Sequence, residues 1–529
     1  MSINCFNIRA LIGSKWFVLL FNTVFFAMMA WLLPMHYEEN DDIVMCMIAN
    51  GGLSGTPDGH LVFINALYGW IIAGLYRLTK IVEWYSLAFC ILHILSMSVV
   101  IFIIIKDCKI RPLYKFLFVV FLYVFWIHII IYFQFTTTAG LLCFSGCLAL
   151  IQPSKKWRII GVCAVFVASL IRFHVAGLVG LLCAPLLIMR LVQDKRFAYW
   201  TMTVVFWGVL GHWADGLFYR QSDWMEYKNY NKVRGFINDN PNAYLAVDVL
   251  PEGIEKEDYI QFCYFQGDPK IMTLTKLQEI QSKIIKGITR QNALSNLSNL
   301  YEYRILISLL VLGYLVCIIL SCRKSNVLLL SVLIVSFFIW VFLLLYLGVM
   351  ATLKERVFFS MLLPEVFIIM KSFSLIETNR HDLFSGMFFL CVIAGLVLRC
   401  SYQDYKAFKW STRTRNSFIN FQMPLCEELE NQDHYIYFRC CNIEYLPVIH
   451  IKDFGFRSVG FGWLTNIPLQ KEILESHRDF VDSNVLYFGE TDAPPVALVE
   501  RIEKNYGIQN ELIIENKNEY FALYKFVSK

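Results

Sequence analysis

Residues 16–60 read WFVLLFNTVFFAMMAWLLPMHYEENDDIVMCMIANGGLSGTPDGH, and this stretch decides the class of fold. It opens with an apolar run, Trp16 to Pro34, of about twenty residues, the length of an α-helix that crosses the hydrocarbon core of a membrane. The run has no small-residue cleavage site and leads into further apolar runs, so we expect a retained helix and not a signal peptide. Directly after it come four carboxylates, Glu38, Glu39, Asp41 and Asp42.

The rest of the chain continues the apolar pattern. Hydrophobic residues make up 57% of the sequence and charged residues 17%. Most of the chain therefore cannot form the core of a soluble protein. We therefore expect an all-α polytopic membrane protein with about eleven transmembrane helices and a small external α/β C-terminal domain. The predicted spans are 16–34, 86–105, 113–133, 136–151, 157–171, 175–190, 198–214, 302–321, 327–348, 357–371 and 383–400.

Orientation follows from the Lys and Arg residues between these runs. The short segments assigned to the cytoplasm hold sixteen of them, and the short external segments hold five. Because cytoplasmic segments carry the excess of positive charge, we expect a cytoplasmic N-terminus in a plasma membrane. The acidic stretch, the loop 215–301 and the chain after residue 400 then lie outside.

The apolar stretch 61–78, LVFINALYGWIIAGLYRL, does not fit as a span. If it crossed the membrane, every later basic segment would face outward, so we expect it to lie in the interface or to re-enter. The predicted segments are 1–34 for the N-terminal tail and first helix, 35–85 for the first external loop, 86–214 for transmembrane helices, 215–301 for an external loop, 302–400 for transmembrane helices and 401–529 for the external domain.

Local patterns predict structure in the two large external parts. The run TLTKLQEIQSKIIKGI has apolar residues at helical spacing. In the tail, HYIYF, NVLYFGE and YFALYKFV are typical of strands, and PVALVERIEKNYG has helical spacing with a glycine stop. The cysteines show no CxxC motif and no spacing that predicts a bridge. External cysteines with free thiols would favour a bacterial envelope that is not strongly oxidising.

The acidic stretch has a chemical interpretation and a plain one. Ionised carboxylates at a membrane surface are costly unless they are solvated or paired, and one of Asp41 and Asp42 could serve as a general base. The glycines that follow would let the backbone turn close to a bound group. The plain interpretation is a solvated acidic loop that only helps to set topology.

The arrangement resembles the GT-C glycosyltransferases. The resemblance lies in ENDDIVMCMIANGGLSGTPDGHLVFINALYGWIIAGLYRL, about forty residues, and otherwise in the order of parts: a first helix, an acidic first external loop, a multi-span body and an external C-terminal domain. It implies an inverting transfer of a sugar from a polyprenyl-phosphate carrier to a glycan, lipid or protein acceptor on the external face. It also implies that Asp41 or Asp42 is the catalytic carboxylate. No nucleic-acid partner is expected.

Such a reaction needs cations to hold the developing charge on the leaving phosphate. The external cations predicted to do so are Arg172 with His174, and Lys354 with Arg356. The alternative for each pair is that the charged side chains only extend to the lipid headgroups. The other predicted substrate-binding residues are Glu39, Asn40, Asp58 and His60. Asp58 and His60, with Asp41 and Asp42, also have the ligand types for a divalent ion, which stays an open alternative with no cofactor assigned.

Other classes of protein remain as alternatives. A lipid-linked oligosaccharide flippase or polysaccharide transporter has a similar number of spans, although internal repeats and short loops would be expected. A polysaccharide polymerase would use the same carriers and could employ the loop 215–301. An external sensor or scaffold without catalytic activity is the remaining alternative. The absence of Walker, dinucleotide and nucleophile-elbow motifs argues against an ATP-driven pump and against a nucleotide-sugar enzyme with a cytosolic catalytic domain.

Overall fold

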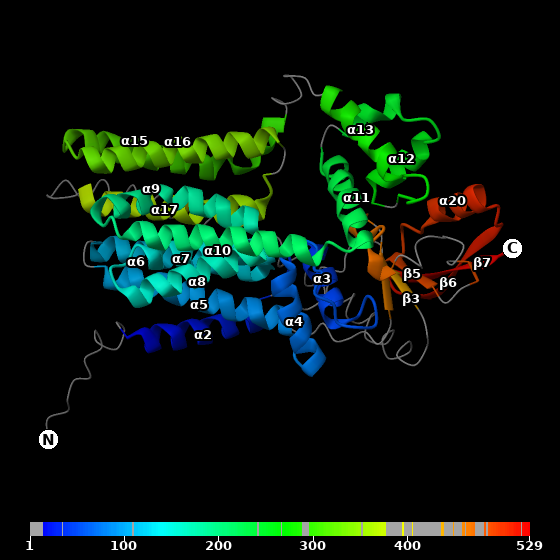
Figure 1. Cartoon of the computed structure of the whole chain (residues 1–529), viewed down its shortest axis with the longest axis horizontal. Helices are drawn as coiled ribbons and strands as arrows, with labels where there is room; N and C mark the ends of the chain where they lie inside the picture. Colours follow the sequence, from blue (N-terminus) through cyan, green and yellow to red (C-terminus); the bar gives the residue numbers. More distant parts are fainter. Residues whose placement is uncertain are drawn as a thin grey trace.

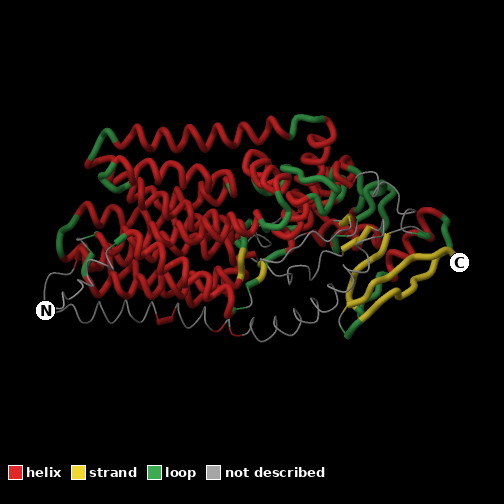
Figure 2. Tube along the Cα trace, turned by 90° about the horizontal axis from the view of Figure 1, so that it is seen from below, coloured by secondary structure: helices red, strands yellow, loops and turns green. Residues whose placement is uncertain are grey.

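A bundle of long, roughly parallel helices forms the larger part of the protein, and a smaller part lies beyond one of its ends (Figure 1). The computed structural model describes residues 14–33, 35–107, 110–240, 243–265, 267–287, 296–350, 353–376, 394–395, 402, 405, 435–438, 448, 457–460, 462–470, 481–482, 485–519 and 521–529. Figure 2 shows the strands of the smaller part at the opposite end of the molecule from the N-terminus.

The bundle confirms a polytopic helical membrane protein. Its helices are α2 (Lys15–Leu32), α5 (Trp84–Lys106), α6 (Pro112–Ile131), α7 (Phe135–Leu150), α8 (Lys155–Ile171), α9 (Phe173–Gln193), α10 (Phe197–Phe218), α15 (Arg304–Arg323), α16 (Val327–Val349) and α17 (Glu355–Ile376). In the described part of the chain, seven helices are long and apolar enough to cross a membrane, and α7 is a shorter apolar helix. The predicted count of eleven stays a prediction, since the span expected at 383–400 falls almost entirely outside the described residues.

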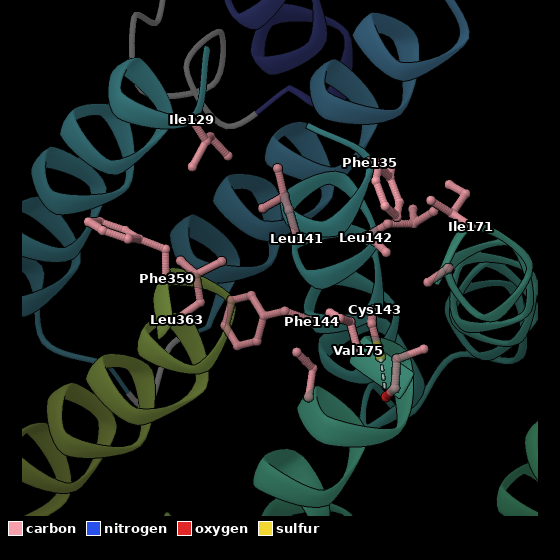
Figure 3. Close-up of a cluster of buried hydrophobic side chains, with 14 of the residues drawn as sticks. Ile129, Phe135, Leu141, Leu142, Cys143, Phe144, Ile171, Val175, Phe359 and Leu363 are labelled. Carbon is pink, nitrogen blue, oxygen red and sulfur yellow. Dashed lines mark hydrogen bonds between the residues drawn. The ribbon is translucent and has the colours of Figure 1, made fainter. Parts of the chain in front are cut away.

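Small residues place α7 at the centre of the bundle. All sixteen of its residues are buried. A Cβ added to Gly161 of α8 would lie 2.7 Å from the carbonyl oxygen of Gly146, and one added to Gly140 would lie 2.5 Å from Oγ of Ser360 in α17. Such close approach is how membrane helices pack without a hydrophobic driving force between them. Figure 3 shows the resulting core, in which Phe135, Leu142 and Phe144 of α7 converge with side chains of the surrounding helices.

The first loop contains two short helices at the end of the bundle, α3 (Asn40–Asn50) and α4 (Ala66–Leu78). With thirteen residues, α4 is about 20 Å long, well short of the roughly 30 Å hydrocarbon core. It runs across the bundle end instead of along the bundle axis (Figure 1). The helix α4 is thus shorter than a membrane span, and the interfacial or re-entrant position of 61–78 stays a prediction.

A two-residue parallel ladder ties the acidic stretch to the bundle. Strand β1 (His36–Tyr37) pairs with β2 (Tyr132–Phe133), which connects α6 to α7. Both strand residues of β1 are buried, and the hydroxyl groups of Tyr37 and Ser86 lie 2.7 Å apart. The start of α3 is thereby held against the ends of α5, α6 and α7.

The loop after α10 forms a small helical unit of its own. It contains α11 (Ser222–Asn238), the 3₁₀ helix η1 (Ala243–Val249), α12 (Lys256–Cys263) and α13 (Leu274–Gly287), and η2 (Leu297–Tyr303) leads into α15. Apolar side chains from these helices make a separate buried cluster, among them Tyr230, Ile237, Phe262 and Ile280. The helix predicted from the spacing in TLTKLQEIQSKIIKGI is confirmed as α13.

The tail contains a five-stranded mixed sheet in the order β4-β3-β5-β7-β6. Its elements are β3 (Tyr435–Phe438), β4 (Arg457–Gly460), β5 (Val485–Glu490), α20 (Val496–Tyr506), β6 (Asn510–Lys517) and β7 (Phe521–Ser528). The three predicted strand runs correspond to β3, β5 and β7, and the predicted helix is α20, which Gly507 ends in the left-handed conformation. The strands β4 and β6 were not predicted.

Candidate functional site

The acidic stretch folds into the start of α3. Glu39 is extended and precedes the helix, and Asp41 and Asp42 occupy the first turn, where carboxylates interact favourably with the helix dipole. At the other end, Gly51 has φ 90°, and a Cβ there would lie 2.8 Å from the backbone nitrogen of Pro57. The glycine-rich turn thus returns the chain directly beneath the helix.

Asp42 is an anchor within the protein. Its side chain is fully buried and accepts hydrogen bonds from the Tyr85 hydroxyl at 2.9 Å and from the Phe135 backbone N–H at 3.2 Å, both on Oδ1. Burial raises the pKa of Asp42 well above its usual range, while the hydrogen bond from Tyr85 opposes the shift. The contacts of Asp42 join α3 to α5 and α7.

Asp41 has a different environment from its neighbour. It is half-buried, and burial raises its pKa to about 6. The guanidinium of Arg356 opposes this increase, the carboxylate of Glu39 adds to it, and Arg172 and Arg234 also lower the pKa. These three arginines come from α17, from the corner between α8 and α9, and from α11. Asp41 thus lies within electrostatic reach of three cations brought by separate elements.

Arg356 is the cation most directly paired with the acidic stretch. Its Nη1 lies 2.5 Å from Oε1 of Glu39 and 3.6 Å from Oε1 of Glu38. Burial raises the pKa of Glu38 to about 7 despite the opposing effect of Arg356. The pairing draws the first turn of α17 against the segment that precedes α3.

Arg172 lies where the predicted spans 157–171 and 175–190 are separated, and the structure confirms two helices. Its backbone is extended between α8 and α9, with φ −152° and ψ 92°. Its Nη1 donates a hydrogen bond to the carbonyl oxygen of Phe63 at 3.2 Å, and the guanidinium carbon lies 5.7 and 5.3 Å from the ring centres of Phe63 and Phe135. Burial lowers its pKa, and Asp41 opposes that shift. Arg172 is therefore a largely enclosed cation held by carbonyl and aromatic partners.

Asp58 and His60 lie at a different junction. Nδ1 of His60 is 2.7 Å from Oδ1 of Asp58, and Nε2 is 3.3 Å from the carbonyl oxygen of Phe218 at the end of α10. The His60 ring stacks on Trp224 of α11 with 4.3 Å between ring centres. The described contacts of this pair thus connect the first loop to the corner between α10 and α11.

The remaining predicted site residues differ in exposure. Asn40 is half-buried at the start of α3, beside Asp41, whereas His174 and Lys354 are exposed. In the ranges that the structure covers, no three or more His, Cys, Asp and Glu side chains gather closely enough to hold a metal ion. The described positions of Asp41, Asp42, Asp58 and His60 therefore do not make a ligand set for a divalent ion.

Two features of the site were not predicted from the sequence. Arg234 and Tyr227 come from α11, and both interact electrostatically with Asp41. Arg234 lowers the pKa of Asp41. Burial raises the pKa of Tyr227, and the charge of Asp41 adds to that increase. They lie seven residues apart, so they share one face of the helix, but nothing local in YKNYNKVRGFIN distinguishes that face.

The second unpredicted feature is a small pocket beside Arg356. The structure places Nε2 of His128 3.6 Å from Oε1 of Glu355, and the His128 ring stacks on Phe359 with 4.2 Å between centres. The residues that line this pocket are Glu38, His128, Ile129, Tyr132, Thr137, Glu355, Arg356 and Phe359.

The fold and this site define a multi-pass membrane protein with a half-buried carboxylate within electrostatic reach of three arginines at one end of the bundle. No protein-family model matches the sequence, and no curated protein matches it. Two solved structures are similar to the chain, ArnT from Cupriavidus metallidurans bound to undecaprenyl phosphate and the same ArnT in the apo state. Each has a TM-score of 0.40 and 11% sequence identity, and the match covers 96% of this chain and 97% of ArnT.

Proposed function

We propose that this chain is a membrane glycosyltransferase of the GT-C type, which moves a sugar from a polyprenyl-phosphate carrier to an acceptor hydroxyl at the outer surface of a bacterial plasma membrane. The observation that carries the proposal is the environment of Asp41, a half-buried carboxylate with a pKa raised to about 6 and three arginines within electrostatic reach. A general base and a set of fixed cations are the two requirements of this reaction.

The proposed base is Asp41. The acceptor hydroxyl gives its proton to Asp41 as its oxygen bonds to the anomeric carbon, and the bond from that carbon to the carrier phosphate breaks on the opposite face. The bonding pair leaves with the phosphate, so the sugar is transferred with inversion. Asp42 is proposed to support this geometry, because both hydrogen bonds to its Oδ1 come from the surrounding helices.

The arginines have separate proposed roles. Arg356 is paired with Glu38 and Glu39, so it sets the position and charge of the acidic segment. Arg172 donates its described hydrogen bond to a neutral carbonyl group, which suits it to the carrier phosphate. Substrate-binding roles are proposed for Glu39, Asn40, Asp58, His60, His174 and Lys354 as the sequence predicts, with His174 and Lys354 at the exposed rim.

A polysaccharide polymerase is the second candidate. It is favoured by one observation, which is that Arg234 from the helical unit after α10 contributes to the electrostatics of Asp41. Both candidates use a polyprenyl-linked donor, and they differ in whether one sugar or a growing chain is transferred. Mass spectrometry of the acceptor product separates them.

The test is a transfer assay on the full chain in nanodiscs. A panel of polyprenyl-phosphate sugars is supplied, and release of free carrier phosphate is measured. We expect Asp41→Asn to lower turnover by about 10²- to 10⁴-fold, the usual contribution of a general base. Arg172→Ala should raise the KM for the donor.

The matched control is Asp223→Asn, which changes an exposed aspartate in the first turn of α11. It should keep full turnover. If no donor is turned over, or if Asp41→Asn retains wild-type turnover, the transferase proposal is wrong. Carrier binding without turnover would then favour the flippase.

A further inference from the structure

Among the described residues of the tail, Trp463 makes an aromatic contact with the first loop of the membrane body. This side chain is 7% exposed and lies in the 3₁₀ helix η4 (Gly462–Leu464), more than 80 residues after the last described residue of α17. Its ring meets that of Phe63 edge to face, with 4.9 Å between the ring centres and an interplanar angle of 64°. Its carbonyl oxygen accepts a hydrogen bond from the Tyr227 hydroxyl at 2.7 Å.

The segment that carries Trp463 is well fixed. The buried amide of Gln470 accepts a hydrogen bond from the Gly460 N–H at 3.0 Å and donates one to the carbonyl oxygen of Leu464 at 2.8 Å. These bonds close the short loop around Trp463, so its ring is presented in one position.

Phe63 contacts both the tail and the site. One side of its ring meets Trp463, and the guanidinium carbon of Arg172 lies 5.7 Å from its ring centre. Its carbonyl oxygen accepts the hydrogen bond from Nη1 of Arg172. The same guanidinium lies over Phe135, whose N–H donates to Asp42. A displacement of Phe63 would therefore move the cation that acts on Asp41.

The neighbouring residue shows that this loop depends on its surroundings. Val62 has φ 65°, a left-handed conformation that a β-branched side chain rarely adopts. Its N–H donates to the Tyr219 hydroxyl at 3.0 Å, and the N–H of Asn65 donates to the carbonyl oxygen of Leu170 at 2.9 Å. Strained backbone persists only where neighbouring contacts hold it in place, and Trp463 is one of the neighbours of this loop.

We propose that Trp463 is a positioning residue, which holds Phe63 against Arg172 and thereby fixes the Arg172 guanidinium over Phe135 at the candidate site. The proposal rests on the proposed function, in which Arg172 binds the carrier phosphate. It assigns to the external C-terminal domain a role in donor binding. The tail and the membrane site then act as one unit.

The test compares Trp463→Ala, Trp463→Phe, Arg172→Ala and the double variant Trp463→Ala/Arg172→Ala in nanodiscs. Trp463→Ala should raise the donor KM about tenfold, the value of one hydrogen bond to a charged group, and leave the acceptor KM unchanged. Trp463→Phe keeps an aromatic edge against Phe63 and should restore the donor KM. Because both single changes act on the same guanidinium, the double variant should be no worse than Arg172→Ala.

The matched control is Ile502→Ala, which opens the tail's own core around α20 without touching Phe63. An unchanged donor KM in Trp463→Ala, additive effects in the double variant, or an equal rise in Ile502→Ala would each overturn the proposal.

Hydrogen exchange at the Asn65 amide separates the two proposals. Faster exchange in Trp463→Ala, but not in Trp463→Phe or Ile502→Ala, supports the positioning of the loop even if no donor is turned over. Unchanged exchange overturns the positioning role even if the transferase is active.

Discussion

Asp41 and Asp42 are adjacent in the sequence, yet the fold gives them opposite surroundings. Asp42 is fully buried with two protein donors on one oxygen, whereas Asp41 is half-buried and faces arginines. A helix turns by about 100° per residue, so neighbouring side chains in a first turn point to different environments. Here one environment is the packed ends of α5 and α7, and the other is the candidate site.

The pKa of Asp41 predicts the pH dependence of turnover. A general base acts when deprotonated, so kcat/KM should fall about tenfold per pH unit below pH 6 and level off above it. Arg356 lowers the pKa of Asp41, so Arg356→Gln should move the acidic limb of the pH–rate profile to higher pH. The measurement is the rate between pH 4.5 and 8.5. Lys371→Gln, at the other end of α17, should leave the limb in place, and an unshifted limb in Arg356→Gln would contradict the assignment.

Glu38 predicts a pH-dependent stability. Its pKa is raised to about 7 by burial, so ionisation costs the folded state more than the unfolded one. The stability of the wild type should therefore fall as pH rises from about 4.5 to 7. Glu38→Gln cannot ionise, so its advantage over the wild type should grow from pH 5 to pH 8 by on the order of 2 kcal/mol, since one pKa unit is about 1.4 kcal/mol.

Thermal unfolding in detergent at the two pH values measures this difference as a shift in Tm. Glu302→Gln, which changes an exposed glutamate, should show a constant difference across the same range. Equal Tm differences for Glu38→Gln at pH 5 and pH 8 would count against a buried ionisable Glu38.

At the scale of elements, α2 packs on the bundle through a narrow face. Its buried residues are Val18, Asn22 and Phe26, which lie on one face. The Asn22 amide donates to Oγ of Ser98 in α5 at 3.0 Å and accepts from the Tyr123 hydroxyl of α6 at 2.7 Å. A polar side chain in an apolar span thus joins three helices.

Asn22→Leu should lower the free energy of unfolding by about 1 to 2 kcal/mol, because the hydroxyl groups of Ser98 and Tyr123 each lose their hydrogen bond to Asn22. Thermal unfolding in nanodiscs, followed by Trp fluorescence, measures the effect. Thr23→Val is the control, since Thr23 is exposed and its hydroxyl donates to Leu19 within the same helix. A wild-type Tm for Asn22→Leu would show that the network does not hold α2.

At the scale of the whole molecule, the tail docks on the helical unit after α10 as well as on Phe63. Lys504 of α20 forms an ion pair with Glu255, and the Tyr506 hydroxyl donates to Asp268 at 3.2 Å. The ammonium of Lys270 lies 5.4 Å from the centre of the Tyr506 ring. These contacts place α20 beside α12 and the turn before α13 (Figure 1).

Charge reversal tests this docking. Lys504→Glu should increase protease cleavage of the tail about two- to threefold at low salt, a small effect because exposed ion pairs contribute little. Glu255→Lys in the same chain should restore the wild-type rate. The difference should shrink in high salt, and a rate that is independent of both changes would argue against the docking seen here.

The long elements are largely predictable from the sequence, because their causes are local. Ten predicted spans coincide with described helices, and the strand and helix patterns of the tail correspond to β3, β5, β7 and α20. A helix in a membrane satisfies its backbone hydrogen bonds within itself, so length and apolar composition are enough to identify it. The strands β4 and β6 were not predicted, because their short or polar runs become strands only beside their partners in the sheet.

The site was only partly predictable. The sequence by itself determined a helical membrane body and an acidic stretch at its surface, because both follow from residues adjacent in the chain. Only the tertiary structure decided that Asp42 is fully buried while Asp41 is half-buried, and that Arg172, Arg234 and Arg356 all come within electrostatic reach of Asp41. These residues are 62 to 315 positions apart, and their convergence depends on how α8, α11 and α17 pack. Side-chain packing between distant elements leaves no periodic pattern in the sequence.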